Sequence, residues 1–192
     1  MPSKLPTGEE PPKGFETLIE TRSGEGLRID CVLVSQLSHL ELREVKDLRN
    51  KALARIMDAA GVMNEHIDFE DEVGLVPDKD VYDKLLFRAY YAGALVGGAL
   101  VFMGYPQNGQ WSIMHIIIDP DCEFGGIRSG LVDVIEQYAR DSKAASTSIF
   151  AIPLVRKGMG FWEEMGYVEK TSEEPIRIAG LDHELVVYNK EL

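Results

Sequence analysis

Small residues gather between positions 125 and 130, where the sequence reads Gly-Gly-Ile-Arg-Ser-Gly. Glycines let a backbone approach a ligand closely, and the free amides and dipole at a helix start attract anionic groups such as phosphates. The same composition also suits a tight turn from a strand into a helix. The cluster alone therefore leaves two interpretations open, a phosphate cradle and a structural turn.

Histidine and cysteine give weaker signals. The four histidines have no metal-ligand spacing, and Cys31 and Cys122 suggest neither a disulfide framework nor a metal site. We therefore expect no bound metal and a reduced, cytoplasmic location. Cys122 lacks an accompanying base that would activate it as a nucleophile. His115 lies in an apolar run, where a hydrogen-bonded core histidine is the simpler interpretation.

Length and composition fit one globular domain. The 192 residues are 45% hydrophobic and carry a net charge of −12, which suits a folded core but not a duplex-binding surface. We expect no nucleic-acid partner and, because no apolar run is long enough, no membrane span. The acidic balance favours a neutral or cationic substrate, although it also serves solubility. Residues 1–14 are predicted to be a disordered lead-in to a domain over 15–192.

The first half of the chain predicts a strand, a long helix and a three-stranded meander. A strand is expected over 27–34, and Ser38 with Glu41 forms a capping box at a helix start. The helix carries an apolar stripe and ends near Gly61; its stripe consists of Leu42, Val45, Leu48, Ala52, Ile56 and Ala59. After an acidic stretch, antiparallel strands are expected over residues 85–91, 95–103 and 111–118.

The second half alternates helices and strands. The continuous apolar run 116–118 predicts a strand that is buried on both faces. Ile127, Leu131 and Ile135 mark a second long helix. A strand over 146–152, a short helix over 156–165, and strands around Tyr167 and over 183–188 complete a mixed α/β domain.

The segment 111–170 resembles the core of the GNAT superfamily of acetyltransferases. A strand ends in Ile118-Asp119-Pro120, a glycine-rich loop opens the next helix, and Phe161-Trp162 precedes Gly166-Tyr167 in a short helix and its exit. The hairpin over 88–103 is similar to the family's preceding strands. The resemblance covers about half of the chain, and the aromatic motif is its most specific part.

The resemblance implies a single GNAT-like domain whose mixed, mostly antiparallel sheet has splayed central strands flanked by helices. It also implies acetyl-CoA as the co-substrate, held by Ile116, Ile118, Gly125, Gly126, Ile127, Arg128, Ser129 and Gly130. The expected function is direct N-acetyl transfer to a small, possibly cationic amine. A homodimer is a further expectation, since strand edges in such folds often pair.

Four positions depart from the family pattern. Glu123 replaces an Arg or Gln, Arg128 replaces a Gly or Ala, and Val155 replaces a frequent Asn. Trp162 stands where a Tyr often protonates the leaving thiolate, and its indole has no suitable acid group. These departures keep a rival function open, in which the protein is a catalytically silent module that binds a ligand or partner.

No general base is clear. Strict alternation along residues 111–118 would place Ser112, Met114 and Ile116 on one face and His115 on the other. The resemblance places strand-borne bases on the face of Ser112, which makes Ser112 a weak candidate, unless a bulge reverses the alternation. Glu65 lies in the acidic segment that borders the acceptor side in the family, as a second weak candidate, although a solvated loop is the simpler interpretation.

Overall fold

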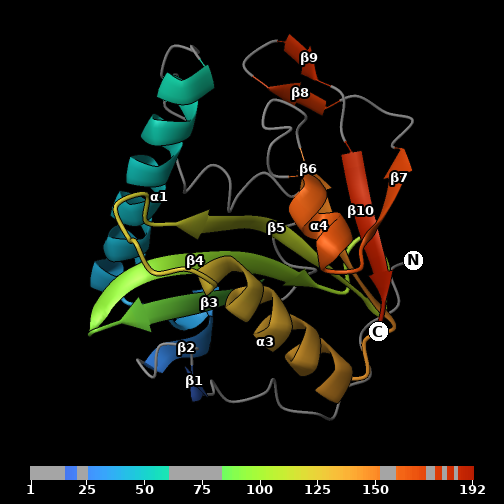
Figure 1. The fold of residues 1–192 in the computed structure, drawn as a ribbon. Coiled ribbons are helices and arrows are strands. Elements are labelled where there is room, and N and C mark those ends of the chain that lie inside the picture. Colours follow the sequence, from blue (N-terminus) through green and yellow to red (C-terminus); the bar gives the residue numbers. More distant parts are fainter. Residues whose placement is uncertain are drawn as a thin grey trace.

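The computed structural model describes residues 16–20, 26–60, 84–151, 159–171, 176–178, 181–183 and 186–192. Eight strands form one sheet with the order β1-β2-β3-β4-β5-β6-β10-β7, and β8 (Ile176–Ile178) pairs with β9 (Leu181–His183) in a separate ribbon. Helices cover both faces of the large sheet (Figure 1). The expected mixed α/β fold is therefore confirmed.

The first five strands form an antiparallel series. They are β1 (Glu16–Glu20), β2 (Gly26–Leu33), β3 (Lys84–Tyr91), β4 (Ala94–Met103) and β5 (Gln110–Ile118). Ala92 and Gly93 turn the chain between β3 and β4 with φ of 49° and 83°, the left-handed pair that a two-residue hairpin requires. The predicted bounds of β2 to β5 agree with the structure within one residue at each end, whereas β1, which is short and begins and ends with glutamate, was not predicted.

The remaining strands complete the sheet beyond β5. β10 (Val186–Glu191) lies between β6 (Ser146–Ala151) and β7 (Val168–Thr171) and is antiparallel to both. The predicted boundaries of the last strand, 183–188, are wrong, since His183 belongs to β9 and β10 begins at Val186. The short helix α4 (Met159–Glu164) precedes β7.

Helix α1 (His39–Ala60) covers one face of the sheet. Its start is the predicted capping box, because the amide of Ser38 donates to the carboxylate of Glu41 at 2.9 Å and the amide of Glu41 donates to the Ser38 hydroxyl at 3.3 Å. Leu48 on the helix packs with Leu86 of β3 and Ile117 of β5. The sheet therefore meets α1 through part of the predicted apolar stripe.

Helix α3 (Ile127–Asp141) covers the opposite face and crosses in front of the sheet in Figure 1. Its buried side is a row of apolar residues that packs on β3, β4 and β5; Ile127, Leu131, Val134, Ile135 and Ala139 form this row. The same core holds Trp162 and Tyr167 of the aromatic motif, whose rings meet edge to face with centroids 5.2 Å apart. Trp162 is therefore a core residue, which suits its size and apolar surface.

Candidate functional site

The two central strands separate after a short parallel junction. Gln110–Ile113 of β5 pairs with Ser146–Ile149 of β6, and past Ile113 no pairing joins β5 to the described part of β6. Four of the five remaining residues of β5, His115 to Ile118, still pair with β4 on their other side. Residues 116–118 thus have no strand partner in the described part of β6, which is the splay expected of the central strands.

A β-bulge interrupts β5 at Met114. Val101 of β4 pairs with Ile113, but the preceding Leu100 pairs with His115, so Met114 is an extra residue. Cross-strand partners share a face, and neighbouring residues of β4 point to opposite faces. The alternation predicted for β5 is therefore wrong: Ser112 and His115 share the α1 face. Ile116 and Ile118 point to the α3 face, where they pack partly buried against its core.

Ser112 is fully buried and is part of the junction. Its hydroxyl donates to the carbonyl of Tyr105 at 2.8 Å and lies 2.8 Å from the hydroxyl of Ser148 on β6. With its proton directed to a backbone carbonyl, Ser112 contributes to joining the two strands. This arrangement gives no support to a role as general base. The other weak candidate, Glu65, lies outside the described residues.

His115 lies under α1. Burial, and to a smaller extent the nearby guanidinium of Arg49 on α1, lowers the pKa of His115 from 6.5 to about 4. The imidazole is consequently neutral near pH 7 and a weak base. A base of this pKa is poorly matched to an ammonium group, since the most effective catalytic pKa lies near the working pH. The interpretation of His115 as a core histidine fits these surroundings better than a catalytic one.

The start of α3 presents backbone amides that have no partner among the described residues. Gly126 caps the helix in the left-handed conformation, with φ of 89°, and contributes no side-chain cap; the first turn holds no acidic residue. The first intrahelical bond runs from the amide of Gly130 to the carbonyl of Gly126 at 2.9 Å, and the hydroxyl of Ser129 donates to the same carbonyl at 3.0 Å. The amides before Gly130 therefore have no acceptor within the helix. They point outward at its N-terminus, where the helix dipole is positive.

Close packing places this helix start beside the splayed strand. Ile127 is buried, and its Cγ2 atom would lie 2.9 Å from a Cβ atom at Gly97 of β4. Only a glycine at this position lets Ile127 come so near without a shift. Gly97, which pairs with Ile118, thus brings the exposed Gly125 and Gly126 to the end of β5.

Two of the four departures lie at the surface beside this helix start. Glu123 is exposed in the loop. Arg128 is also exposed, and its guanidinium carbon lies 5.1 Å from the ring centroid of Phe161 on α4, a cation–π distance. The contact joins the first turn of α3 to α4. Trp162, the third departure, is buried, and Val155 lies outside the described residues.

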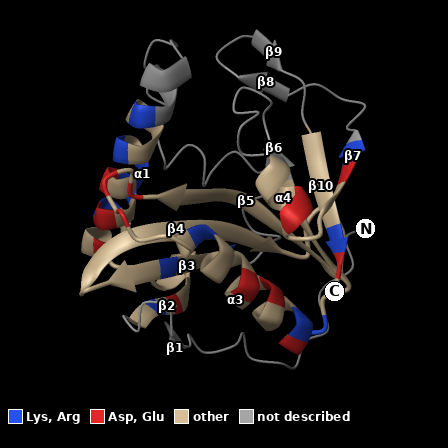
Figure 2. Cartoon of the chain, viewed as in Figure 1, with Lys and Arg blue, Asp and Glu red and all other residues tan. Residues whose placement is uncertain are grey.

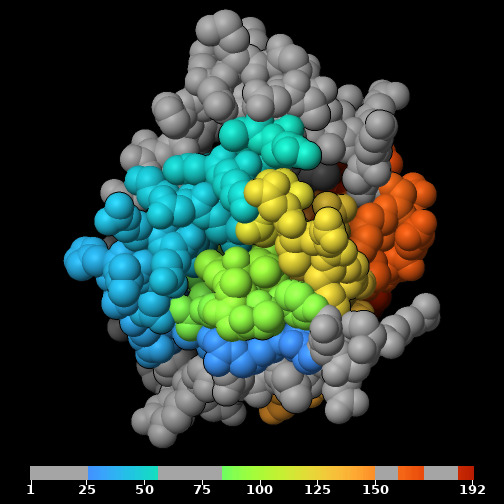
Figure 3. Space-filling model, turned by 60° about the vertical axis from the view of Figure 1, so that its left-hand side comes forward, coloured from blue at the N-terminus to red at the C-terminus, as the bar shows by residue number. Residues whose placement is uncertain are grey.

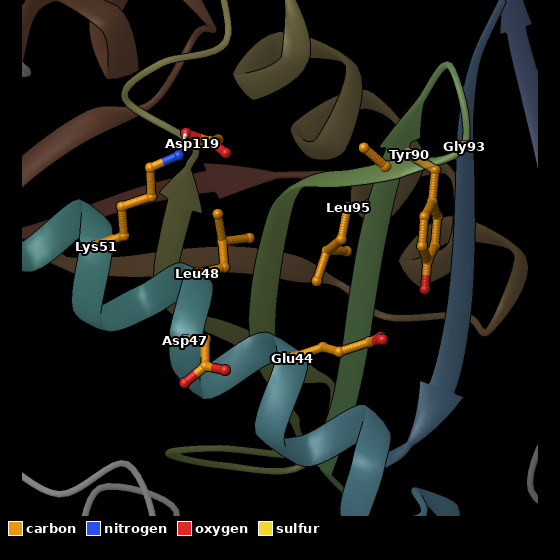
Figure 4. Close-up of a pocket in the computed structure, with 9 residues that line it drawn as sticks. Glu44, Asp47, Leu48, Lys51, Tyr90, Gly93, Leu95 and Asp119 are labelled. Atoms are coloured by element: carbon orange, nitrogen blue, oxygen red, sulfur yellow. Dashed lines mark ion pairs between the residues drawn. The ribbon is translucent and has the colours of Figure 1, made fainter.

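The loop before α3 borders a shallow cavity of about 430 Å³ on the α1 side (Figure 4). Its walls come from α1, the β3–β4 hairpin and the end of β5; they include Glu44, Asp47, Leu48, Lys51, Tyr90, Leu95 and Asp119. Asp119 follows the end of β5, whereas the bulge at Met114 lies inside the strand. The cavity is therefore separated along β5 from the bulge.

Among the described residues, no helix is long and apolar enough to cross a membrane. In the same part of the chain, no group of three or more His, Cys, Asp or Glu is placed to hold a metal ion.

Comparisons with solved structures show the same fold at low sequence identity. The GNAT domain of S. lividans PAT is 15% identical, with a TM-score of 0.64 over 92% of this chain and 97% of that one. The ribosomal-protein-alanine N-acetyltransferase from Brucella melitensis is 16% identical, with a TM-score of 0.60 over 84% and 99%. The ribosomal-protein-S18-alanine N-acetyltransferase from Escherichia coli is 11% identical, with a TM-score of 0.57 over 85% and 93%.

No curated protein matches the chain significantly by sequence. The model of the acetyltransferase (GNAT) family, however, matches residues 51–167, a segment that runs from α1 through the splayed strands to the aromatic motif. Because this match covers more than half of the chain, and the sheet and helices have the architecture of the solved relatives, the chain belongs to the acetyltransferase (GNAT) family.

Proposed function

We propose that the protein is an N-acetyltransferase that passes the acetyl group of acetyl-CoA directly to a small amine. The observation that carries this proposal is the start of α3, whose free amides lie beside the splayed end of β5. A helix start of this kind binds phosphate groups through its amides and dipole. The pyrophosphate of acetyl-CoA would occupy it, in contact with the backbone from Gly125 to Gly130.

The end of β5 beyond its junction with β6 suits the rest of the donor. Pantetheine is an extended chain with two amide groups, and residues 116–118 present a row of backbone donors and acceptors on the side away from β4. Pairing with that row would bring the thioester toward the bulge at Met114. Partly buried Ile116 and Ile118 would line the α3 side of the passage.

The reaction would be a direct displacement at the thioester carbonyl. The neutral amine attacks the carbonyl carbon, the C–N bond forms, the C–S bond breaks, and coenzyme A leaves as the thiolate. Fixed backbone amides stabilise the oxyanion that forms on the way. The proton that the amine loses passes to solvent and from there to the thiolate. The net charge of −12 favours a cationic acceptor.

The contact between Arg128 and Phe161 favours one rival, a silent family member that no longer takes up acyl-CoA. If this contact blocks the phosphate site, the wild type binds acetyl-CoA poorly and Arg128→Gly binds it better. If Arg128 instead turns to a phosphate, Arg128→Ala weakens binding by about 1.5–3 kcal/mol, the worth of hydrogen bonds to a charged group. The two functions therefore predict opposite signs for substitution of the same residue.

Calorimetry with acetyl-CoA on the wild type and these variants decides between them. Glu123→Gln should tighten binding in both cases, because a carboxylate about 5 Å from a phosphate costs about 3 kcal/mol at an effective dielectric of about 20. Release of free coenzyme A in the presence of a panel of cationic, neutral and acidic amines then tests transfer. If neither the wild type nor any variant binds an acyl-CoA, the proposed enzyme function is wrong.

A further inference from the structure

Lys51 on α1 contacts two carboxylates of the loop that leads from β5 to α3. Its Nζ atom lies 2.6 Å from Oδ1 of Asp119 and 2.9 Å from Oδ2 of Asp121. Figure 4 shows the lysine reaching across from the helix to Asp119 at the end of the strand. One side chain of α1 thereby connects two residues of a loop that is distant from it in sequence.

The loop is held at both ends. On the α1 side, the amide of Asp121 donates to Asp119 Oδ1 at 2.9 Å and the amide of Cys122 donates to the Asp119 carbonyl at 3.1 Å. Toward the helix start, the ring of Phe124 stacks on Tyr91 of β3 with centroids 4.5 Å apart. In Figure 3 the yellow region, which includes this loop, adjoins both α1, in cyan, and the β3–β4 hairpin, in green. Its path into Gly126 is thus set by contacts on two sides.

Besides holding the loop, Lys51 changes the electrostatics beside the start of α3. Asp119, Asp121 and Glu123 place three carboxylates just before the helix start, and acidic residues of this loop lie beside α1 in Figure 2. Each would repel a phosphate bound at α3. Lys51 neutralises one charge and keeps Asp119 and Asp121 paired toward α1.

Building on the proposed function, we propose that Lys51 is a positioning residue of the acyl-CoA site. It holds residues 119–121 against α1, so that the loop enters Gly126 with the amides of α3 presented to the donor, and it keeps two carboxylates from facing the phosphates. Lys51 does not touch the reacting atoms, and its effect therefore falls on donor binding and not on the chemical step.

The first test compares acetyl-CoA binding and turnover in matched variants. Lys51→Met should raise the Kd and the KM for acetyl-CoA about tenfold, or 1.4 kcal/mol, and leave kcat within twofold. Lys51→Arg should stay within threefold of the wild type, because a guanidinium also pairs with carboxylates. The control is Arg43→Met, which removes a charge from an exposed position on the same helix. A Lys51→Met protein that binds acetyl-CoA as well as Arg43→Met does would overturn the proposal.

A second variant separates the charge effect from a general loss of structure. Adding Asp121→Asn to Lys51→Met removes one of the released carboxylates and should recover about threefold in Kd. The tenfold loss should also shrink as potassium chloride is raised from 50 to 500 mM, roughly as exposed charges become screened. A loss that neither the second substitution nor salt changes contradicts the electrostatic part.

Hydrogen exchange of the protein without ligand tests the loop independently of acyl-CoA. Lys51→Met should speed exchange at the amides of Asp121 and Cys122, and Arg43→Met should not. Unchanged exchange together with unchanged Kd would reject Lys51 as a positioning residue and leave the proposed function standing. No acyl-CoA binding by the wild type would overturn the proposed function and the donor role of Lys51, while exchange would still report whether Lys51 holds the loop.

Discussion

The two faces of the sheet are built from different interactions. Under α3 the core is one large apolar cluster, which includes Phe87, Val101, Ile113 and Leu131. Under α1 the apolar clusters are small, and buried charged side chains lie among them. Arg88 there donates to Asp30 of β2 at 2.8 and 2.9 Å and to Glu41 of α1 at 2.8 Å.

The two helices are therefore held against the sheet by different interactions. Helix α3 is placed mainly by close packing, which responds to changes in side-chain volume but little to pH or salt. One buried carboxylate of α3, Glu136, also accepts from Lys190 of β10 at 2.7 and 2.8 Å. Helix α1 is placed partly by hydrogen-bonded charges, which depend on protonation and on both partners remaining present. The helix start that would hold the donor belongs to α3, whereas the lysine on its loop comes from α1. The candidate site therefore depends on both kinds of interaction.

Two adjacent leucines of β3 lie on opposite faces of the sheet, so their substitution compares the packing of the two cores. Leu85 lies in the large cluster under α3, and Leu86 lies in the small cluster under α1; both are almost fully buried. We expect Leu85→Ala to lower the free energy of unfolding by about 4 kcal/mol and Leu86→Ala by about 3 kcal/mol, within the range for buried leucines. Urea unfolding of both variants provides the measurement. Equal losses would mean that the two cores are equally tight.

The pH dependence of stability should come from the α1 face. The folded pKa of His115, about 4, lies below its ordinary value of 6.5, so between these values the unfolded state binds more protons. Stability is then lost as pH falls from about 6.5 to 4, by at most about 3 kcal/mol. His115→Gln should flatten this part of the profile, and His39→Gln, at an exposed position, should not. An unchanged slope in His115→Gln would show that other groups cause it.

Two neighbouring glycines of β4 lie on opposite faces of the sheet, so the addition of one methyl group at each compares how tightly the two faces are packed. A Cβ atom at Gly97 would meet Ile127 at 2.9 Å, whereas one at Gly98, on the α1 face, has its nearest atom at 3.4 Å. Gly97→Ala should cost about 1–3 kcal/mol by overpacking and weaken acetyl-CoA binding, because Ile127 is displaced. Gly98→Ala should be near neutral. Thermal unfolding and calorimetry on both proteins check this, and a Gly97→Ala protein with normal binding would contradict it.

The smallest expected effect concerns the start of α1. Hydrogen bonds from Ser38, and then from Arg88, lower the pKa of Glu41 from 4.5 to about 2. The stabilisation is complete above about pH 4.5 and disappears as pH falls toward 2, since the unfolded state takes up the proton first. Glu41 is partly exposed, which limits the gain to about 1 kcal/mol. Glu41→Gln should remove this step from acid titrations, and Glu44→Gln on the same helix should retain it.

Much of the fold was predictable because local patterns and tertiary structure agree. The capping box at Ser38, the hairpin turn at Gly93 and the aromatic motif around Trp162 each determine a short segment, and each lies where the sequence indicated. The start of α3 at Gly126 also follows from its glycines. Local patterns therefore predicted the elements that surround the candidate site.

The details of that region were not predictable for a physical reason. The segment around Met114 is mostly apolar and has no clear alternation, so the bulge that places His115 on the α1 face becomes visible only in its pairing with β4. Likewise, Gly97 and Lys51 act through Ile127 and Asp119, which are remote in sequence. Such contacts depend on the three-dimensional arrangement and leave no periodic signal.

The short junction between β5 and β6 has a consequence for how the molecule opens. Its four residue pairs are the backbone connection between the series β1 to β5 and the group of β6, β10 and β7 in the described sheet. Proteins often unfold in parts that separate where cooperative contacts are fewest. We expect a partially unfolded state in which β6, β10 and β7 detach together while β2 to β5 stay paired. In native-state hydrogen exchange, amides between β6 and β5 should then open at lower denaturant than those between β3 and β4, and simultaneous opening would exclude such a state.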